Sequence, residues 1–273
     1  MKSIIPPEGD SLQLWTNIVN RKKLKTRVLL SGEKAFIEER YLFYKERFNR
    51  LDEVRPIDWS SKGTIKSELI NCYGNNVCFN EAKTRLLSNI YRCPYCTINR
   101  PNTLDHYFDK GKYPEYAVFL PNLVPCCSEC NSQKGSDLFT DDWQRQYIHF
   151  YFDFIPDYKF LFVNYDFSSQ STIPTISIKL NFQTNDEHIE RMNRHYSKLK
   201  LLKKIKEAIV DRLPGVMKEM ALLKRSYSND IIKQLLFCQY LGIVSQKGLN
   251  YWEACMYKGI IDSADFLENV NAS

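Results

Sequence analysis

Four cysteines in two pairs are the clearest candidate metal ligands of this sequence. The motif CPYC begins at Cys93 and the motif CSEC begins at Cys127, so two residues separate the cysteines of each pair. This spacing lets both thiolates of a tight turn reach one ion, and two such turns supply the four sulfur ligands of a structural zinc site. Cys126 could compete with Cys127, but the spacing favours Cys127, because neighbouring side chains of an extended segment face opposite ways. We predict a structural Zn²⁺ bound by Cys93, Cys96, Cys127 and Cys130.

Two candidate oxygen ligands and a candidate general base lie between and just after the two cysteine pairs. Asp105 offers a carboxylate oxygen and Asn131 an amide oxygen, the hard ligands that Mg²⁺ and Mn²⁺ prefer. Two protein ligands leave positions on the ion for water and phosphate oxygens. His106 is a natural general base, since an unperturbed imidazole has a pKa of about 6.5. This set predicts metal-assisted phosphodiester hydrolysis, but it requires a bend at Asp105-His106, because adjacent strand residues normally face opposite sides.

The segments CPYC, LDHYFDK and PNLVPCCSECNSQKG together resemble the zinc-containing subclass of HNH endonucleases, over about 45 of the 273 residues. The resemblance implies a ββα-metal module in which His106 is the general base and Asn131 replaces the final histidine as a ligand of Mg²⁺ or Mn²⁺. It also implies that Asn122 holds the loop and orients His106, and that a bend brings Asp105 to the same centre. The expected activity is endonucleolytic cleavage of DNA, with RNA left open as a substrate.

Two further interpretations concern partners. The order of the motifs is similar to that of HNH subunits that pair with ATPases in bacterial anti-phage systems such as the Septu type, although the expected Glu-His is Asp105-His106 here. That similarity implies an ATPase partner subunit and a role in antiviral defence. The alternative is a non-catalytic, zinc-dependent nucleic-acid-binding subunit of a larger complex. The joint presence of Asp105, His106 and Asn131 argues against this alternative, because a pure binder needs none of them.

Lysines near the candidate site are candidate phosphate contacts. Lys110 and Lys112 follow the candidate base, and Lys134 lies near the end of a short helix expected from Ser128 to Gly135. At that position Lys134 could instead simply favour the helix dipole. Two lysine-rich runs could follow a nucleic-acid backbone or form solvated helix faces: residues 21–25 and 198–206. The remaining histidines are expected to be structural or surface residues: His149, His188 and His195.

The composition predicts a globular protein outside membranes. Apolar residues make up 44% of the chain, enough for a substantial core, and the net charge of +6 is compatible with a phosphate partner. The N-terminus lacks a signal-peptide apolar segment, and no stretch reaches the roughly 18 apolar residues that span a bilayer. We therefore expect a soluble, cytoplasmic protein without a membrane partner. Nine cysteines there argue against a disulfide framework, and four are expected to be small buried residues: Cys72, Cys78, Cys238 and Cys255.

Hydrophobic periodicity predicts an α+β fold that is mainly helical. Apolar residues recur at helical spacing in 11–55, 66–70 and 80–90. A further helical pattern begins at Asp186, and Pro214 should end or restart it. Two β-rich runs, Lys159–Phe167 and Thr175–Phe182, flank the polar loop Ser168–Ile173 and predict a β-hairpin. We predict three regions: a helical N-terminal region at 1–90, the nuclease module at 91–140, and a hairpin plus helical C-terminal region at 141–273.

Overall fold

The computed structural model describes residues 2–74, 76–88, 90–167 and 174–270 of the chain. The described chain is mostly helical and contains two small antiparallel sheets, which confirms the predicted α+β class. It divides into two compact units, one formed mainly by residues 3–153 and the other mainly by residues 154–273. The predicted N-terminal region and nuclease module thus belong to one unit. No helix among the described residues is both long and apolar enough to cross a membrane.

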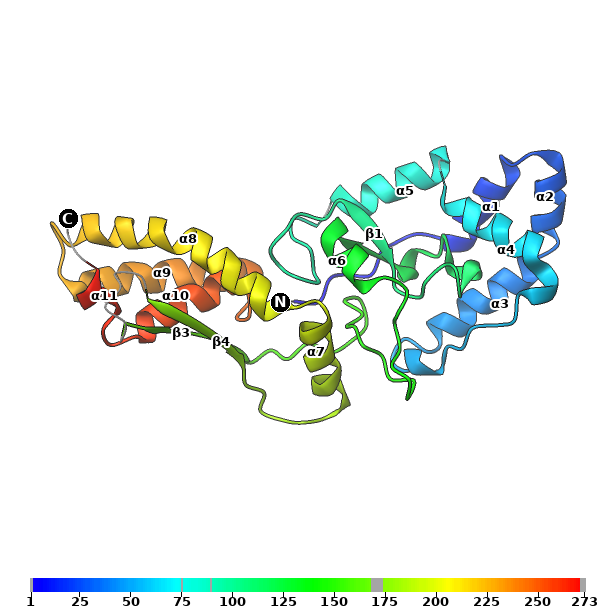
Figure 1. Ribbon diagram of the computed structural model, residues 1–273. Helices are drawn as coiled ribbons and strands as arrows, with labels where there is room; N and C mark the ends of the chain where they lie inside the picture. The colour runs from blue at the N-terminus through cyan, green and yellow to red at the C-terminus, as the bar shows by residue number, and fades with distance from the viewer. Residues whose placement is uncertain (1, 75, 89, 168–173, 271–273) are drawn as a thin grey trace. The chain divides into compact units, whose positions relative to one another are not determined.

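The first unit is built from helices and one short two-stranded sheet (Figure 1). Its α-helices are α1 (Ser11–Asn20), α2 (Leu24–Ser31), α3 (Lys34–Lys45), α4 (Gly63–Ile70), α5 (Val77–Ser88) and α6 (Ser128–Lys134). Single turns of 3-10 helix are η1 (Leu51–Glu53), η2 (Ser60–Lys62), η3 (Asn71–Tyr73), η4 (Pro114–Tyr116) and η5 (Leu120–Asn122). The strands β1 (Thr103–His106) and β2 (Leu123–Cys126) pair antiparallel, and α6 lies against β1.

Capping and aromatic packing explain the N-terminal helices of this unit. Asp10 caps α1, because its carboxylate accepts hydrogen bonds from the N–H groups of Leu12 and Gln13 at 2.8 and 3.0 Å. α3 buries Tyr44, whose ring packs edge-on against that of Phe108 at 5.4 Å between centroids. The aromatic residues of the sequence thus fill a core between α3 and the segment after β1: Tyr41, Tyr44, Phe108, Tyr116 and Phe119.

The second unit consists of a β-hairpin and helices. β3 (Leu161–Asp166) and β4 (Thr175–Leu180) pair antiparallel, which confirms the predicted hairpin, while the predicted loop Ser168–Ile173 lies outside the described residues. The helices are α7 (Glu187–Lys198), α8 (Leu201–Leu223), α9 (Asn229–Lys247), α10 (Trp252–Asp262) and α11 (Phe266–Asn269). α10 packs on β3 and on α9. Gly259 permits this close approach, because a Cβ atom there would clash with the carbonyl oxygen of Val163.

Pro214 neither ends nor restarts a helix, so that prediction was wrong. α8 runs through Pro214 without interruption. The reason is burial: Leu213 before the turn and Val216 and Met220 after it belong to one buried stripe. Packing of this stripe offsets the hydrogen bond that a proline cannot donate and the crowding of its ring against the preceding turn.

Burial of the four scattered cysteines agrees with our prediction in only two cases. Cys72 and Cys255 are buried, but Cys78 is half-buried and Cys238 is exposed. Cys238 is two residues away from the buried Leu236 in α9, which corresponds to about 200° around a helix. The helix therefore turns this cysteine outward, although its residue type favours burial.

Candidate functional site

The four cysteines of the two motifs form one cluster. The Sγ atoms of Cys93, Cys96, Cys127 and Cys130 all lie within 4.8 Å of one another, and all four residues are buried. A tetrahedral zinc with Zn–S bonds of about 2.3 Å places its sulfurs about 3.8 Å apart, so the cluster fits such an ion. It contains Cys127 and not Cys126, as the spacing predicted. These cysteines could therefore hold a metal ion.

The cluster anchors the helix that follows the second pair. α6 begins with Cys127, rather than the expected Ser128, in the N-cap position, and ends at Gly135. The φ of 57° at Gly135 is left-handed, a conformation that glycine adopts without strain, as we predicted. Asn99 supports both pairs: its carbonyl accepts a hydrogen bond from the Cys93 N–H at 2.8 Å, and its amide nitrogen donates to the Cys127 sulfur at 3.9 Å. Two of the four sulfurs thus fix the start of α6.

Asp105, an expected metal ligand, is buried and bound within the protein. Only 2% of its surface is exposed. One carboxylate oxygen accepts a hydrogen bond from the Tyr95 hydroxyl at 2.6 Å, and the other pairs with the Lys134 ammonium at 3.0 Å. The carboxylate therefore has a cation beside it, but this cation is a lysine of α6. Sequence reasoning missed the role of Tyr95, although its place inside the CPYC motif already put it next to the site.

The Lys134 ammonium, an expected phosphate contact, is hydrogen-bonded within the protein. It donates to the Asp105 carboxylate and to the carbonyl oxygens of His106 at 3.0 Å and Tyr107 at 3.1 Å. These acceptors use all three protons of the ammonium, and the residue is only 2% exposed. Lys134 therefore ties the end of α6 to the end of β1, and no proton remains for a phosphate oxygen in this arrangement.

The side chains of His106 and Asp105 have different neighbours, because adjacent residues of a regular strand point to opposite faces. β1 keeps regular pairing through both residues, with Asp105 opposite Val124 and His106 opposite Leu123, so the expected bend is absent from the strand. Nε2 of His106 lies 2.9 Å from the carbonyl oxygen of Ala117. Because a carbonyl only accepts, Nε2 carries the ring proton and Nδ1 keeps its lone pair. Nδ1 makes no hydrogen bond with any described residue.

The surroundings of His106 keep its imidazole neutral. Burial lowers the pKa of His106 to about 3; the hydrogen bond to Ala117 opposes this shift, and the charges of Lys110 and Lys134 add to it. The ring of Tyr73 stands edge-on to the imidazole at 4.2 Å between centroids, and the Lys110 ammonium lies 4.5 Å from the centre of the Tyr73 ring. No motif marks Tyr73, so only the fold brings it to the site.

Asn122 makes hydrogen bonds within the segment that connects β1 to β2. It is fully buried. Its amide oxygen accepts a hydrogen bond from the Phe108 N–H at 2.8 Å, and its amide nitrogen donates to the carbonyls of Phe108 and Tyr116 at 3.0 and 3.3 Å. Asn122 therefore fixes the backbone next to Ala117, whose carbonyl orients His106.

Asn131 and the two loop lysines differ in their accessibility. The Asn131 amide nitrogen donates weakly to the Thr103 hydroxyl at 3.5 Å, and its amide oxygen accepts no hydrogen bond from the described residues. Lys112 is exposed and Lys110 is half-buried. The loop that carries both lysines turns on Asp109, whose carboxylate accepts a hydrogen bond from the Lys112 N–H at 3.1 Å. Asn131, Lys110 and Lys112 thus keep polar groups that a ligand could reach.

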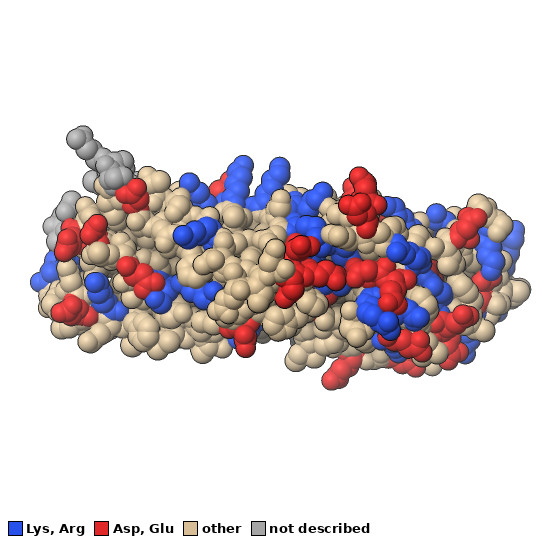
Figure 2. All heavy atoms as spheres, turned by 90° about the horizontal axis from the view of Figure 1, so that it is seen from below, with Lys and Arg blue, Asp and Glu red and all other residues tan. Residues whose placement is uncertain are grey.

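Charged side chains of both signs occur on the face of the protein drawn in Figure 2. Figure 2 shows basic and acidic groups interspersed on one face, with broad uncharged areas rather than one continuous basic patch. In the run 198–206, four lysines are exposed, as predicted for a helix with a buried apolar side: Lys198, Lys200, Lys203 and Lys206. The other three histidines lie outside the candidate site, and His149 and His195 are buried while His188 is exposed.

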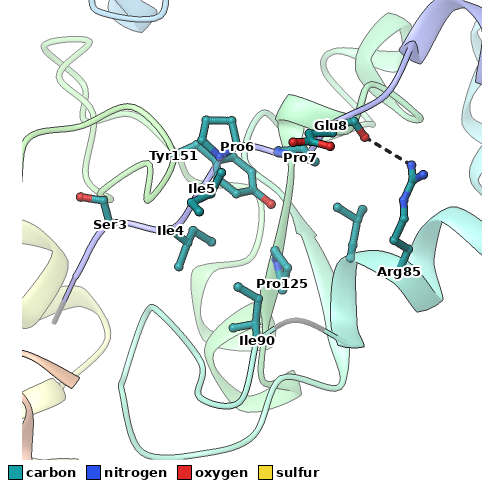
Figure 3. A pocket seen from close by; sticks show the side chains of 11 residues that line it. Ser3, Ile4, Ile5, Pro6, Pro7, Glu8, Arg85, Ile90, Pro125 and Tyr151 are labelled. Carbon is teal, nitrogen blue, oxygen red and sulfur yellow. Dashed lines mark hydrogen bonds between the residues drawn. The ribbon is translucent and has the colours of Figure 1, made fainter. Parts of the chain in front are cut away.

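A pocket of about 530 Å³ lies beside β2 in the first unit (Figure 3). Residues 3–8 form one wall of the pocket. The other lining residues are Arg85, Leu86, Ile90, Pro125 and Tyr151. Most of these side chains are apolar, and the Arg85 guanidinium closes one end by donating to the Glu8 carbonyl at 3.3 Å. None of the predicted site residues lines this pocket, so sequence reasoning gave no indication of it.

The chain is similar to Protein ea31 of Escherichia phage lambda. The two sequences are 24% identical over 243 residues, which cover 82% of this chain and 81% of that protein. No family model matches the chain, and no solved structure matches it. The similarity extends over both units and well beyond the cysteine motifs, but it assigns no activity to this chain.

Proposed function

We propose that this protein is a metal-dependent endonuclease of the HNH type that hydrolyses phosphodiester bonds in DNA, with Zn²⁺ in the four-cysteine cluster. The observation that carries the proposal is the state of His106. Its Nε2 is engaged by the Ala117 carbonyl, and its Nδ1 keeps a lone pair that has no partner among the described residues. An imidazole held in one tautomer is what a general base requires.

In the proposed reaction, Nδ1 of His106 takes a proton from the water that attacks phosphorus. Ala117 fixes the direction of the ring, and Asn122 fixes the loop that contains Ala117, so both act as positioning residues. The proposed Zn²⁺ has no part in the bond-breaking step. It would hold α6 against the strands through Cys127 and Cys130.

The proposal includes a second metal ion, Mg²⁺ or Mn²⁺, which would stabilise the charge that develops on the phosphate. Asn131 fits a ligand of that ion, because its amide oxygen has no partner among the described residues. Asp105 fits such a ligand only in part. Its carboxylate is a suitable ligand type, but it already pairs with the Lys134 ammonium. Lys134 would have to leave before the metal ion binds, because the two cations would repel each other.

Cleavage of plasmid DNA tests the proposed reaction. Purified full-length protein should nick or cut a supercoiled plasmid with Mg²⁺ or Mn²⁺, and His106→Ala should reduce the rate by at least about 100-fold, the usual contribution of a general base. His188→Ala is the matched control, because His188 is an exposed histidine outside the site. Both variants should bind as much zinc as the wild type. Undiminished cleavage by His106→Ala would refute the assignment of the base.

The second candidate function is a zinc-dependent nucleic-acid-binding subunit without catalysis. The observation in its favour is the buried pair of Asp105 and Lys134, which closes the expected metal ligand within the protein. This candidate predicts DNA binding that disappears when the cysteine cluster is removed, and no cleavage with any divalent metal. The same plasmid assay, combined with a gel-shift measurement on Cys96→Ser, distinguishes the two candidates.

We also propose an ATPase partner and a role in antiviral defence, on the resemblance of the motifs alone. Co-expression with the products of neighbouring genes, followed by native mass measurement, tests this extension. Full nuclease activity of the isolated chain, with no second protein bound, would contradict it while leaving the nuclease proposal intact.

A further inference from the structure

The long helix α9 has an outer side without charge. It buries Ile232, Leu236 and Tyr240, and α10 covers that side. On the opposite side no Asp, Glu, Lys or Arg occurs anywhere from Gln234 to Gln246. Large apolar side chains are exposed instead, each to between 43% and 47%: Ile231 and Leu241 on the outer side, and Leu235 and Phe237 on its two flanks. A helix at a protein surface normally carries charged residues there, so this side has the composition of a contact surface.

The spacing of these residues indicates that the contact is made with another helix. Ile231, Gln234, Cys238, Leu241 and Ser245 follow one another at intervals of three and four residues, and we call this set the outer stripe of α9. Such intervals place residues in one line along a helix, where a second helix can interdigitate with them. Gly242 adjoins the stripe, and a Cβ added to it would meet nothing within 4 Å. Inside a helix, glycine costs about 1 kcal/mol relative to alanine, and a close helix–helix approach explains its presence.

The outer stripe is complementary to itself when two copies run antiparallel about Cys238. In that register Leu235, which flanks the stripe, lies level with Leu241 of the other copy, and the large Ile231 faces the small Ser245. Asp230 at the start of the helix comes near Lys247 at the end of its partner copy, which also lies 3.7 Å from Glu253 of its own chain, so opposite charges meet at both ends. The dipoles of two antiparallel helices also favour this arrangement.

We propose that α9 is a self-association surface, on which two copies of this chain form an antiparallel helix pair centred on Cys238. The helix of 19 residues is about 28 Å long. A single pair of helices of that length makes a small interface. The dimer should therefore form reversibly and depend on concentration. The proposal does not depend on the proposed nuclease activity.

Sedimentation equilibrium over a series of concentrations tests the dimer. The wild-type mass should rise from 32.2 kDa towards twice that value, whereas Leu235→Glu should stay at 32.2 kDa at every concentration. Val210→Glu is the matched control, because Val210 is 51% exposed on α8 and should leave the dimer unchanged. Circular dichroism checks that both variants keep the helical content of the wild type. A wild type that stays monomeric throughout, or a Leu235→Glu variant that dimerises like the wild type, would overturn the proposal.

Cross-linking tests the register. Diamide takes two electrons and two protons from a pair of thiols, and it should join two chains through Cys238 in the wild type. Cys238→Ser should abolish this cross-link, while Cys78→Ser, which alters a half-buried cysteine of α5, should keep it. A cross-link that persists in Cys238→Ser, or a dimer in which Cys238 does not react, would show that the copies do not meet at Cys238 and would refute the antiparallel pair.

Discussion

The buried His149 should make this protein sensitive to mild acid. Burial lowers the pKa of His149 from 6.5 to about 3; the carboxylate of Asp153 opposes this shift, and the positive charges of Arg145 and Lys134 add to it. The imidazole also faces the Tyr44 hydroxyl at 3.1 Å and packs at a tilt against the Phe152 ring. The folded protein thus accepts a proton on this ring far less readily than the unfolded chain does.

The magnitude follows from the linkage between proton binding and folding. Because the folded pKa is lower, the unfolded state binds more protons between about pH 6.5 and pH 3, so stability is complete above this window and falls as the pH falls through it. Each pKa unit corresponds to 1.36 kcal/mol, so this one group should cost about 2 kcal/mol of unfolding free energy at pH 5. At pH 3 the cost would reach about 4 kcal/mol, and its limit well below pH 3 is about 5 kcal/mol.

Urea unfolding at pH 7 and pH 5 in zinc-containing buffer measures the effect. His149→Gln should lose about 2 kcal/mol less than the wild type between the two pH values, because glutamine does not titrate. His106 and the cysteine cluster also contribute to the pH dependence of the unfolding free energy. Their contributions are the same in the wild type and in His149→Gln, so they cancel when the two proteins are compared. His188→Gln, at an exposed position, should behave like the wild type. An equal pH dependence of the wild type and His149→Gln would refute the reasoning.

Three further predictions concern the site. Cys127→Ser should lose the bound metal while Cys126→Ser keeps it, because only Cys127 belongs to the cluster; zinc per chain, measured by plasma mass spectrometry, decides this. Lys134→Met leaves the Asp105 carboxylate buried without its cation, and urea unfolding at pH 7 should show a loss of about 3–5 kcal/mol. Asn122→Ala removes three hydrogen bonds worth about 1 kcal/mol each, so a loss well below about 3 kcal/mol would contradict the loop-holding role.

Features that depend on a few neighbouring residues could be predicted from the sequence. The choice of Cys127 over Cys126 followed from a spacing of two residues within one turn, and the end of α6 at Gly135 followed from a conformation that few other residues adopt. The β-hairpin at β3 and β4 was also predictable, because alternation of side chains acts within each strand. In each case a few neighbouring residues contain all the information.

Features that depend on contacts between residues far apart in the sequence could not be predicted. Lys134 was assigned to phosphate because nothing near it shows that Asp105, on another element, takes its charge. Tyr73 reaches His106 only through the packing of the N-terminal helices. Pro214 was expected to break a helix, but the buried stripe of α8 outweighs its local preference. Tertiary packing decides all three positions, and a single sequence does not display it.

The proposed metal ion and Lys134 compete for one carboxylate. Asn131 and Lys134 are three residues apart on α6, so they lie on neighbouring positions of the same side of the helix. An ion that joins Asp105 to Asn131 would therefore approach the Lys134 ammonium, and two cations in a buried site repel strongly. Lys134 must then move away, and its movement frees the carbonyl of His106 that it now holds. Binding of the proposed metal ion and the position of the proposed general base would thereby be coupled through one side chain.

This competition predicts the metal affinity of a variant. Lys134→Met should bind Mn²⁺ more tightly than the wild type, since the competing charge is gone, even though the metal-free variant is less stable. Thermal unfolding with increasing Mn²⁺ measures both effects, because an ion that binds only the folded state raises the melting temperature. Lys112→Met, at an exposed lysine of the loop after β1, is the matched control and should respond to Mn²⁺ like the wild type. If Mn²⁺ stabilises Lys134→Met no more than the wild type, Asp105 is not a ligand of the second metal, and its pair with Lys134 serves only to join α6 to β1.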